Sequence, residues 1–240
     1  MSAPDFILTQ DIAAHGGCPP ASCCGSLDLR LGDCMDVMKT FPDGHFDLAI
    51  VDPPYGIGAH EEQGLGDGRN GNRKESKWIG GKWDQSVPSA EYFAELRRVS
   101  KHQIVWGGNY FDLPPSRGFL IWDKVQRIDQ ADCEMAWTSL GSSARIFTFA
   151  RGNLQGFRNP DRFHPTEKPV KLYSWIFANY ATPGMRVLDT HMGSGSIAIA
   201  AHYAGVHLTA CEIDADYFAA ATARIERETR QTDLFIHHNT

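Results

Sequence analysis

Short apolar segments alternate with helical segments along most of the chain, and this alternation constrains the fold more than any other feature. Residues 27–31 alternate apolar and polar side chains, and residues 46–51 are apolar except for Asp47, as expected of strands. Residues 89–100 instead place apolar side chains at helical spacing. Strands that alternate with helices form parallel βαβ units. The sequence therefore predicts an α/β fold with a doubly wound, mostly parallel sheet.

The remaining elements follow the same alternation. Further strands are expected at residues 102–106, 119–122, 133–138, 145–150, 186–189 and 208–211. Further helices are expected at residues 35–41, 170–180, 197–204 and 217–230. The 240 residues, 42% of them hydrophobic, suit a single domain over residues 27–230 better than two domains. Residues 1–26 are expected to form a flexible arm and residues 231–240 a tail.

A polar turn, Asp52-Pro53-Pro54-Tyr55, directly follows the apolar strand at residues 46–51. Two prolines fix a rigid, extended backbone and leave carbonyl oxygens free to accept hydrogen bonds. Asp52 and the Pro53 carbonyl could each accept one hydrogen of a planar amine, and Tyr55 could stack on its ring. Holding both hydrogens turns the nitrogen lone pair toward attack. The turn therefore indicates chemistry on an exocyclic amine, although a turn that only ends a strand is the alternative.

A glycine-rich turn follows the strand at residues 186–189 and leads into a helix. It contains Asp189, Gly193, Ser194 and Gly195, and such small residues let the backbone approach a ligand. Glu212 ends the next strand, where a carboxylate could bind ribose hydroxyls. An NAD site has a similar layout, but Ala198 replaces the third glycine of its fingerprint. The match to an NAD site is therefore weak, and a turn without a ligand also stays open.

Together the two motifs resemble those of the amino DNA methyltransferases, which modify N6 of adenine or N4 of cytosine. The resemblance spans roughly residues 27–228, and the catalytic motif precedes the cofactor motif, as in the β-class permutation. It implies a circularly permuted, seven-stranded, Rossmann-like sheet and S-adenosylmethionine as the cofactor. It also implies that the target base leaves the duplex to reach Asp52.

The resemblance assigns roles to individual residues. The catalytic set is Asp52, Pro53, Pro54 and Tyr55. The cofactor set is Asp33, Thr166, Lys168, Asp189, His191, Gly193, Ser194, Gly195 and Glu212. Asp33 is implied near the cofactor adenine, and Thr166 and Lys168 at the cofactor carboxylate. His191 departs from the family, which usually has Phe there, so we expect altered cofactor packing rather than lost binding.

Two segments concentrate basic charge on a chain whose net charge is -6. Residues 69–82 carry five basic side chains and one acidic one, and residues 151–171 carry five basic and two acidic ones. This pattern is typical of a phosphate-binding face, although solvated loops share it. We expect DNA contacts from insertions near 56–83 and 151–165. The candidates are Arg69, Arg73, Lys74, Lys77, Lys82, Arg151, Arg158 and Arg162, with Trp78, Trp83 and Phe157 available for stacking.

The base and the reaction have several alternatives. Asp52 favours adenine, because the N4-cytosine enzymes of the family more typically have Ser there. Cytosine stays open, since both amines present the same hydrogens. An RNA or protein-amide methyltransferase, a catalytically silent nucleic-acid-binding protein and a dinucleotide oxidoreductase are further alternatives. The intact Asp52–Tyr55 motif beside an intact glycine-rich turn argues against the silent protein.

The remaining expectations concern partners and location. Gln231–Phe235 resembles the short peptide by which bacterial enzymes dock on the replicative sliding clamp. Cys18, Cys23 and Cys24 lack zinc-ribbon spacing, so reduced thiols and no metal are expected. No run approaches about 18 apolar residues, and residues 1–11 lack a secretory pattern. We therefore expect no membrane contact and a cytoplasmic location in a bacterium or phage-infected host, as a monomer or a homodimer.

Overall fold

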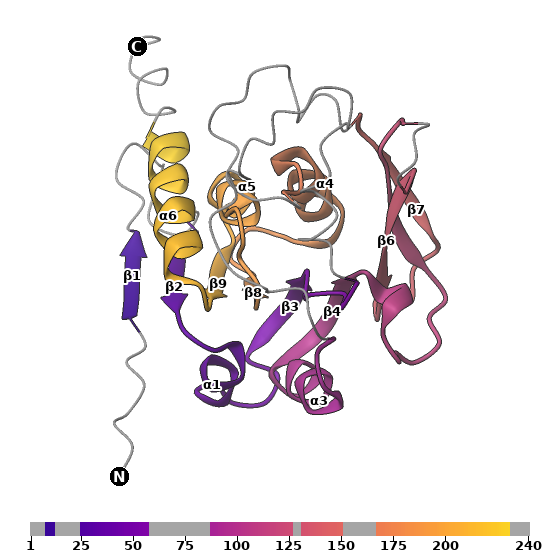
Figure 1. Cartoon of the computed structure of the whole chain (residues 1–240), viewed down its shortest axis with the longest axis horizontal. Coiled ribbons are helices and arrows are strands. Elements are labelled where there is room, and N and C mark those ends of the chain that lie inside the picture. The colour runs from indigo at the N-terminus through magenta and orange to yellow at the C-terminus, as the bar shows by residue number, and fades with distance from the viewer. Residues whose placement is uncertain (1–7, 13–24, 58–86, 127–130, 151–166, 231–240) are drawn as a thin grey trace, which may run out of the picture.

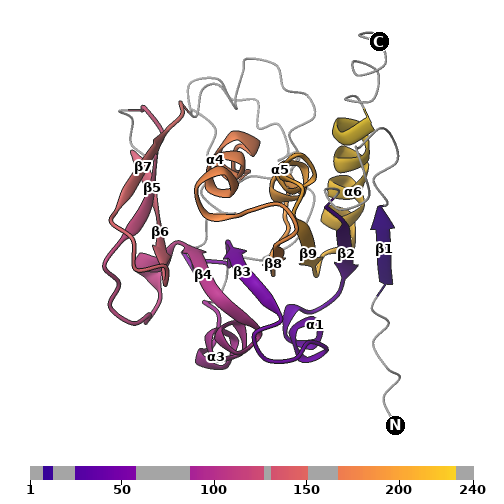
Figure 2. The same cartoon turned by 180° about the vertical axis from the view of Figure 1, so that it is seen from behind.

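The computed structural model describes residues 8–12, 25–57, 87–126, 131–150 and 167–230. These residues form a central sheet with helices on both faces (Figures 1 and 2). One face is covered by α4 (Val170–Tyr180), α5 (Ser196–Ala204) and α6 (Ala215–Arg230). The opposite face carries α1 (Cys34–Lys39) and α3 (Ala90–Val99). None of the helices in these ranges is both long and apolar enough to cross a bilayer.

Within the described residues the sheet has nine strands in the order β1-β2-β9-β8-β3-β4-β6-β5-β7. Their bounds are β1 Leu8–Ile12, β2 Leu27–Leu31, β3 Phe46–Val51, β4 Ser100–Trp106, β5 Phe119–Asp123, β6 Cys133–Thr138, β7 Arg145–Thr148, β8 Arg186–Asp189 and β9 His207–Glu212. The five strands from β2 to β4 run parallel. β6 is antiparallel to both β4 and β5. The α/β class and the mostly parallel sheet are therefore confirmed.

The seven strands that the resemblance implies are too few, whereas the eight strands expected from the sequence pattern are all present. Seven inner strands are present, and β1 and β7 extend the two edges. β1 falls within the segment that the sequence assigned to a flexible arm, and it pairs antiparallel with β2 from Leu8 opposite Leu31 to Ile12 opposite Leu27. β1 pairs with β2 through hydrogen bonds of its backbone N–H and C=O groups. The pattern of apolar side chains does not predict such a pairing.

The core is divided between the two faces by the alternation along each strand. In β3, Leu48 and Ile50 pack in the cluster beneath α4 and α5, whereas Ala49 and Val51 pack in the cluster with α1 and α3. A strand that is buried on both faces has a nearly continuous run of apolar residues, and this run predicted β3. Helix α3 contributes its apolar stripe to the second cluster through Tyr92, Phe93, Leu96 and Val99.

The chain reverses its direction of winding between β8 and β3. From β8 it passes through α5 to β9 on one side, whereas β3 is followed by β4 on the other side. Doubly wound sheets bind ligands outside the carboxyl ends of the strands at such a point. Asp52 follows β3, Asp189 ends β8, and Glu212 ends β9. The fold therefore places the two predicted motifs at neighbouring strand ends on one edge of the sheet.

Candidate active site

The Asp52–Tyr55 turn is internally bonded. The Tyr55 hydroxyl donates a 2.6 Å hydrogen bond to Asp52 Oδ1. Burial, and then the nearby Asp52 carboxylate, raises the pKa of Tyr55 well above its ordinary value, so the hydroxyl stays protonated. The Tyr55 ring stacks on Tyr110 at 5.0 Å between centroids and 15° between planes. Tyr110 lies in the 3-10 turn η1 (Gly108–Tyr110) and is 45% exposed.

Gly107 makes room for the Tyr55 ring. This glycine follows β4 and has φ +68°, in the left-handed region that other residues rarely adopt. A Cβ atom built on it would lie 2.2 Å from Tyr55 Cε1. A side chain at position 107 would therefore displace the tyrosine ring and strain the backbone as well.

Lys168 is buried and lies between two carboxylates. Its ammonium donates a short hydrogen bond to Asp52 Oδ2 and lies 3.2 Å from Glu134 Oε2. It also lies over the Trp106 ring, 5.4 Å from the centroid. Burial alone would lower the pKa of Lys168, but Asp52 and Glu134 raise it, so the ammonium form persists. Lys168 therefore contacts the predicted catalytic turn, and its expected contact with a cofactor carboxylate stays a prediction.

A second lysine completes a chain of alternating charges. Lys124 follows β5, and its ammonium lies 2.8 Å from Glu134 Oε1. Burial would raise the pKa of Glu134, but Lys168 and Lys124 lower it to about 2. The order Lys124–Glu134–Lys168–Asp52 therefore ends on the predicted catalytic carboxylate. Each carboxylate oxygen accepts more than one hydrogen bond, so Asp52 retains capacity for an amine.

The glycine-rich turn brings backbone amides to Glu212. The Gly193 amide donates to Glu212 Oε2 at 2.9 Å, and the Ile213 and Asp214 amides donate to Oε1 at 3.0 and 3.1 Å. Gly193 and Gly195 have φ of 52° and 75°, which glycine adopts without steric cost. A Cβ on Gly195 would lie 2.9 Å from Ile225 Cδ1 of α6. The turn is thus fixed against both β9 and α6.

Asp189 is the buried carboxyl of this turn. Its Oδ1 accepts a 3.0 Å hydrogen bond from the His191 amide. Burial raises the pKa of Asp189 to about 8 and is only partly offset by that bond. Within the described ranges no ion pair forms at Asp189. A buried carboxyl that has no cation of its own suits a ligand that brings positive charge, as a sulfonium and an ammonium group would.

His191 is held as a neutral ring. Its Nδ1 lies 2.8 Å from Thr190 Oγ1, which in turn lies 2.6 Å from the Tyr92 hydroxyl. Burial lowers the pKa of His191 to about 4. The ring also packs edge-on against Tyr92 with centroids 5.7 Å apart. The histidine thus preserves an aromatic surface where the resemblance leads one to expect Phe, and adds a hydrogen bond.

Two further groups border the end of β9 and β2. Ile213 follows Glu212 and is 69% exposed, so it offers an apolar surface beside the carboxylate. Asp33 caps helix α1, because its Oδ1 accepts from the Met35 amide at 2.7 Å. The Gly32 amide before it donates to the Glu212 carbonyl at 2.9 Å. These contacts bring Asp33 next to the Glu212 end of β9.

Comparison with known proteins agrees with this geometry. The family model of N6/N4 DNA methylases matches residues 122–223. YubD, a candidate methylase of Escherichia coli (strain K12), is 26% identical over 208 residues, covering 81% of this chain and 88% of the relative. These matches support the assignment of the chain to the amino DNA methyltransferases.

Two solved structures share the fold of this methyltransferase. The M1.HpyAVI–SAM complex is 17% identical with a TM-score of 0.51, covering 82% of this chain and 99% of that one. The PvuII DNA methyltransferase, described as cytosine-N4-specific, is 13% identical with a TM-score of 0.52, covering 90% and 96%. At these identities the likeness concerns the fold.

Several predicted residues of the methyltransferase lie outside the described residues. They are Thr166, the DNA-contact candidates Arg69, Arg73, Lys74, Lys77, Lys82, Arg151, Arg158 and Arg162, the cysteines Cys18, Cys23 and Cys24, and the tail Gln231–Phe235. Among the described residues, no three His, Cys, Asp or Glu side chains come together as a metal site requires.

Sequence reasoning missed Glu134, Lys124 and Tyr110. Glu134 and Lys124 stand in or beside strands where a charged residue reads as a solvated position. A charge within the apolar neighbourhood of Trp122 and Met135 was the available signal, since buried charges need partners. Nothing local marked Tyr110, whose ring meets Tyr55 only through the packing of β3 beside β4.

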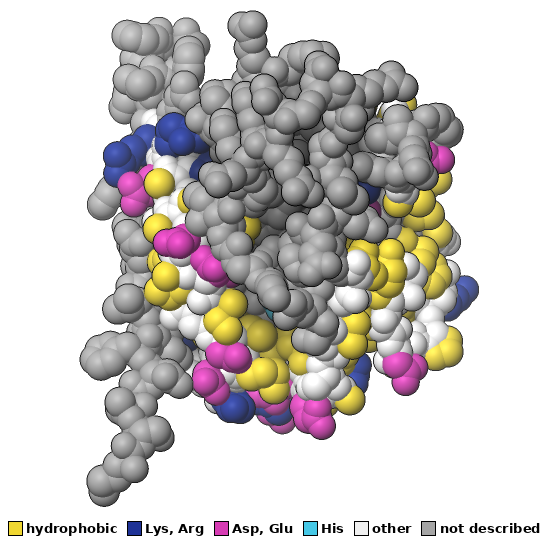
Figure 3. Space-filling view, viewed as in Figure 1, with side chains coloured by type: hydrophobic (Ala, Val, Ile, Leu, Met, Phe, Trp, Pro, Cys, Tyr) yellow, Lys and Arg dark blue, Asp and Glu magenta, His cyan; other side chains and the backbone are white. Residues whose placement is uncertain are grey.

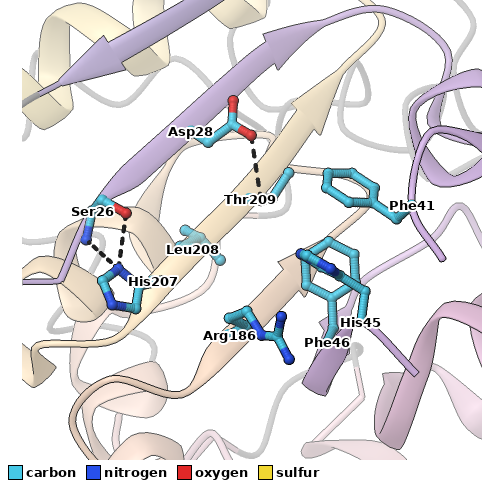
Figure 4. A pocket seen from close by; sticks show the side chains of 9 residues that line it. All are labelled: Ser26, Asp28, Phe41, His45, Phe46, Arg186, His207, Leu208 and Thr209. Carbon is cyan, nitrogen blue, oxygen red and sulfur yellow. Dashed lines mark hydrogen bonds between the residues drawn. The ribbon is translucent and has the colours of Figure 1, made fainter. Parts of the chain in front are cut away.

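A shallow cavity of about 260 Å³ lies at the other edge of the methyltransferase sheet. It is lined by residues at the amino ends of β2, β3, β8 and β9, including His45, Arg186 and His207 (Figure 4). Ser26 and His207 bond to each other across one side of it. Because it opens at the strand ends opposite Asp52 and Glu212, this cavity is separate from the site described above.

Proposed function

We propose that this protein transfers a methyl group from S-adenosylmethionine to N6 of adenine in DNA, which releases S-adenosylhomocysteine and one proton of the amine. The observation that carries the proposal is the placement of Asp52 and Asp189 at the ends of two hydrogen-bonded neighbouring strands, β3 and β8. One end supplies a polar acceptor set for an amine, and the other supplies a buried carboxyl and glycine backbone for a cationic cofactor. Bringing a donor and an acceptor together in the right geometry raises the rate of the transfer.

The cofactor would be held by the turn after β8. Asp189 would meet its positive charge, the Gly193–Gly195 backbone would pass close to the methionine part, and Glu212 and Ile213 would meet the ribose and the adenine ring. When bound, S-adenosylmethionine supplies an electrophilic methyl group. The buried Asp189 fits this group, because its carboxyl has no cationic partner among the described residues.

Asp52 and its neighbours would orient the amine. Asp52 and the Pro53 carbonyl would each accept one amine hydrogen, which directs the nitrogen lone pair toward the methyl group. Tyr55 keeps the carboxylate oriented through its 2.6 Å hydrogen bond, and Lys168 keeps it charge-balanced. Tyr110 is the partly exposed aromatic ring beside the turn, and we assign it the stacking contact with the everted base.

Adenine is proposed because position 52 is Asp. Cytosine N4 is the second candidate, because Asp52 and the Pro53 carbonyl do not distinguish the two amines. Both amines are able to satisfy the same two acceptors. We propose the basic residues of 69–82 and 151–162 as the DNA-contacting groups for either base.

Incubating the purified protein with methyl-labelled cofactor and DNA of mixed sequence tests the proposal. Digestion to nucleosides should place the label in N6-methyladenine. We expect Asp52→Asn to lower the rate at least about 100-fold while leaving the dissociation constant of the cofactor nearly unchanged.

Asp43→Asn is the matched control, since Asp43 precedes β3 at the far end of the same strand and forms an exposed pair with Arg98. It should keep the wild-type rate. Label in N4-methylcytosine would show that the target base is cytosine rather than adenine. DNA without label, together with intact cofactor binding, would refute the proposed activity.

A further inference from the structure

Arg224, on α6, lies outside both sequence motifs and yet contacts the cofactor turn. Its guanidinium is 12% exposed. Its Nη1 donates to the Ser194 carbonyl at 3.0 Å and to Ser196 Oγ at 3.1 Å. One side of this guanidinium therefore holds the glycine-rich turn where it passes into α5.

The other nitrogens of Arg224 hold two carboxylates. Nη2 lies 3.0 Å from Glu167 Oε1, and Nε donates to Glu228 Oε1 at 2.9 Å. Glu167 is the residue directly before Lys168, whose ammonium contacts Asp52. A single side chain thus connects the turn that would hold the cofactor with the segment that supplies Lys168 to the catalytic carboxylate.

The position of this cation is explained by geometry rather than by helix electrostatics. Ser196 begins α5, and a positive charge near the amino end of a helix is unfavourable. Glu167 and Glu228 offset that cost. Arginine presents donors in a rigid planar fork, so it is able to bond a carbonyl, a hydroxyl and two carboxylates at once, which lysine cannot.

We propose that Arg224 is a positioning residue that sets the spacing between the glycine-rich turn and the Glu167–Lys168 segment. This inference rests on the proposed function, since the spacing matters only if donor and amine meet there. Loosening the turn weakens cofactor binding, and loosening Glu167 allows Lys168 and Asp52 to shift. A displacement of about 1 Å at reacting groups is enough to lower a rate by up to about 100-fold.

Three variants separate the contact of Arg224 with the glycine-rich turn from its contact with Glu167. Arg224→Met should raise the dissociation constant of S-adenosylmethionine about tenfold, measured by calorimetry, and also lower kcat about tenfold. Glu167→Gln removes the carboxylate charge that pairs with Arg224 beside Lys168. It should lower kcat about tenfold and leave the dissociation constant within about twofold of wild type. Arg224→Lys keeps the charge without the fork and should resemble Arg224→Met.

Arg230→Met is the control, because Arg230 lies on the same helix, is 78% exposed and pairs only with Glu226 among the described contacts. It should behave as wild type. All assays are run well below the unfolding midpoint of each variant, and Arg224→Lys decides the matter should Arg224→Met not fold. A lowered midpoint with wild-type dissociation constant and kcat would assign Arg224 a structural role only and overturn the proposal. A wild-type protein that does not bind the cofactor would instead refute the proposed function.

Discussion

Among single residues, Glu134 has the most demanding surroundings. Its carboxylate lies between the ammonium groups of Lys124 and Lys168, and both lysines are buried. Removing such charges from water costs several kcal/mol for each ion unless partners compensate. The four charges from Lys124 to Asp52 sum to zero, so each one is compensated only while the others remain. Glu134 therefore matters to the site through the charge it shares with Lys168.

Glu134→Gln should lower the free energy of unfolding by about 3 kcal/mol at pH 7, since it leaves two buried ammonium groups with one carboxylate. Urea denaturation measures this loss. The pKa of Glu134 is lowered to about 2 from an ordinary 4.5, so its stabilisation is complete above pH 4.5 and disappears as the pH falls toward 2. The difference between variant and wild type should shrink over that interval.

Asp36→Asn supplies the comparison, because Asp36 forms an exposed i,i+3 pair with Lys39 on α1. Its cost should stay below about 0.5 kcal/mol. Equal losses for the two variants would mean that the charge chain around Glu134 does not stabilise the fold.

Among the elements, the strand ends at the switch point concentrate the unfavourable features of the fold. β8 delivers Asp189 into a buried position where its pKa is raised to about 8, and the following turn needs two glycines with positive φ. Neither feature helps β8 to pair or pack. Such local costs persist at sites where binding repays them. These local costs are what we expect of the cofactor site proposed at the end of β8.

Asp189→Asn should remove a pH dependence of stability. The folded pKa of about 8 exceeds the ordinary 3.8, so the folded state holds a proton that the unfolded state releases. The contribution is complete below pH 3.8 and is lost as the pH rises toward 8, by up to about 1.4 kcal/mol per pH unit. Asn keeps the Oδ1 acceptor for the His191 amide and carries no titrating proton. We expect the free energy of unfolding of the variant, measured by urea denaturation at pH 5 to 8, to increase relative to that of the wild type as the pH rises. Parallel pH profiles of the two proteins would contradict this.

Some of the strands and contacts were predictable from the sequence, and others were not. β3 was predicted from its nearly continuous apolar residues, and β8 and β9 from the short apolar segments before Asp189 and Glu212. β1 was missed because an edge strand is defined by its partner, β2, rather than by its own pattern. The contact of Lys168 with Asp52 was not predicted, because it depends on how the segment before α4 packs near β3. Glu134 and Arg224 were missed for the same reason, since their partners are distant in the sequence.

At the scale of the whole molecule, charge is unevenly divided along the chain. The net charge is -6, yet residues 69–82 and 151–171 are basic. On the described surface, acidic and basic side chains are mixed, and Figure 3 shows Lys and Arg gathered near the carboxyl end of α6. A polyanion meets overall repulsion from such a molecule. Binding to DNA must then depend on local basic segments, and its salt dependence should report how many phosphates they contact.

A pair of double variants with equal charge change tests where those contacts are. Arg73→Gln with Lys74→Gln removes two charges from the basic segment, whereas Lys39→Gln with Lys101→Gln removes two exposed charges from α1 and the start of β4. Each phosphate contact contributes about 0.9 to the slope of log K against log salt concentration. Titrating duplex DNA at several salt concentrations should therefore show the slope of the first variant reduced by about 2 and that of the second unchanged. Because both variants have the same net charge, equal slopes would mean that DNA responds to the overall charge of the molecule, and the assignment of residues 69–82 to the DNA interface would be wrong.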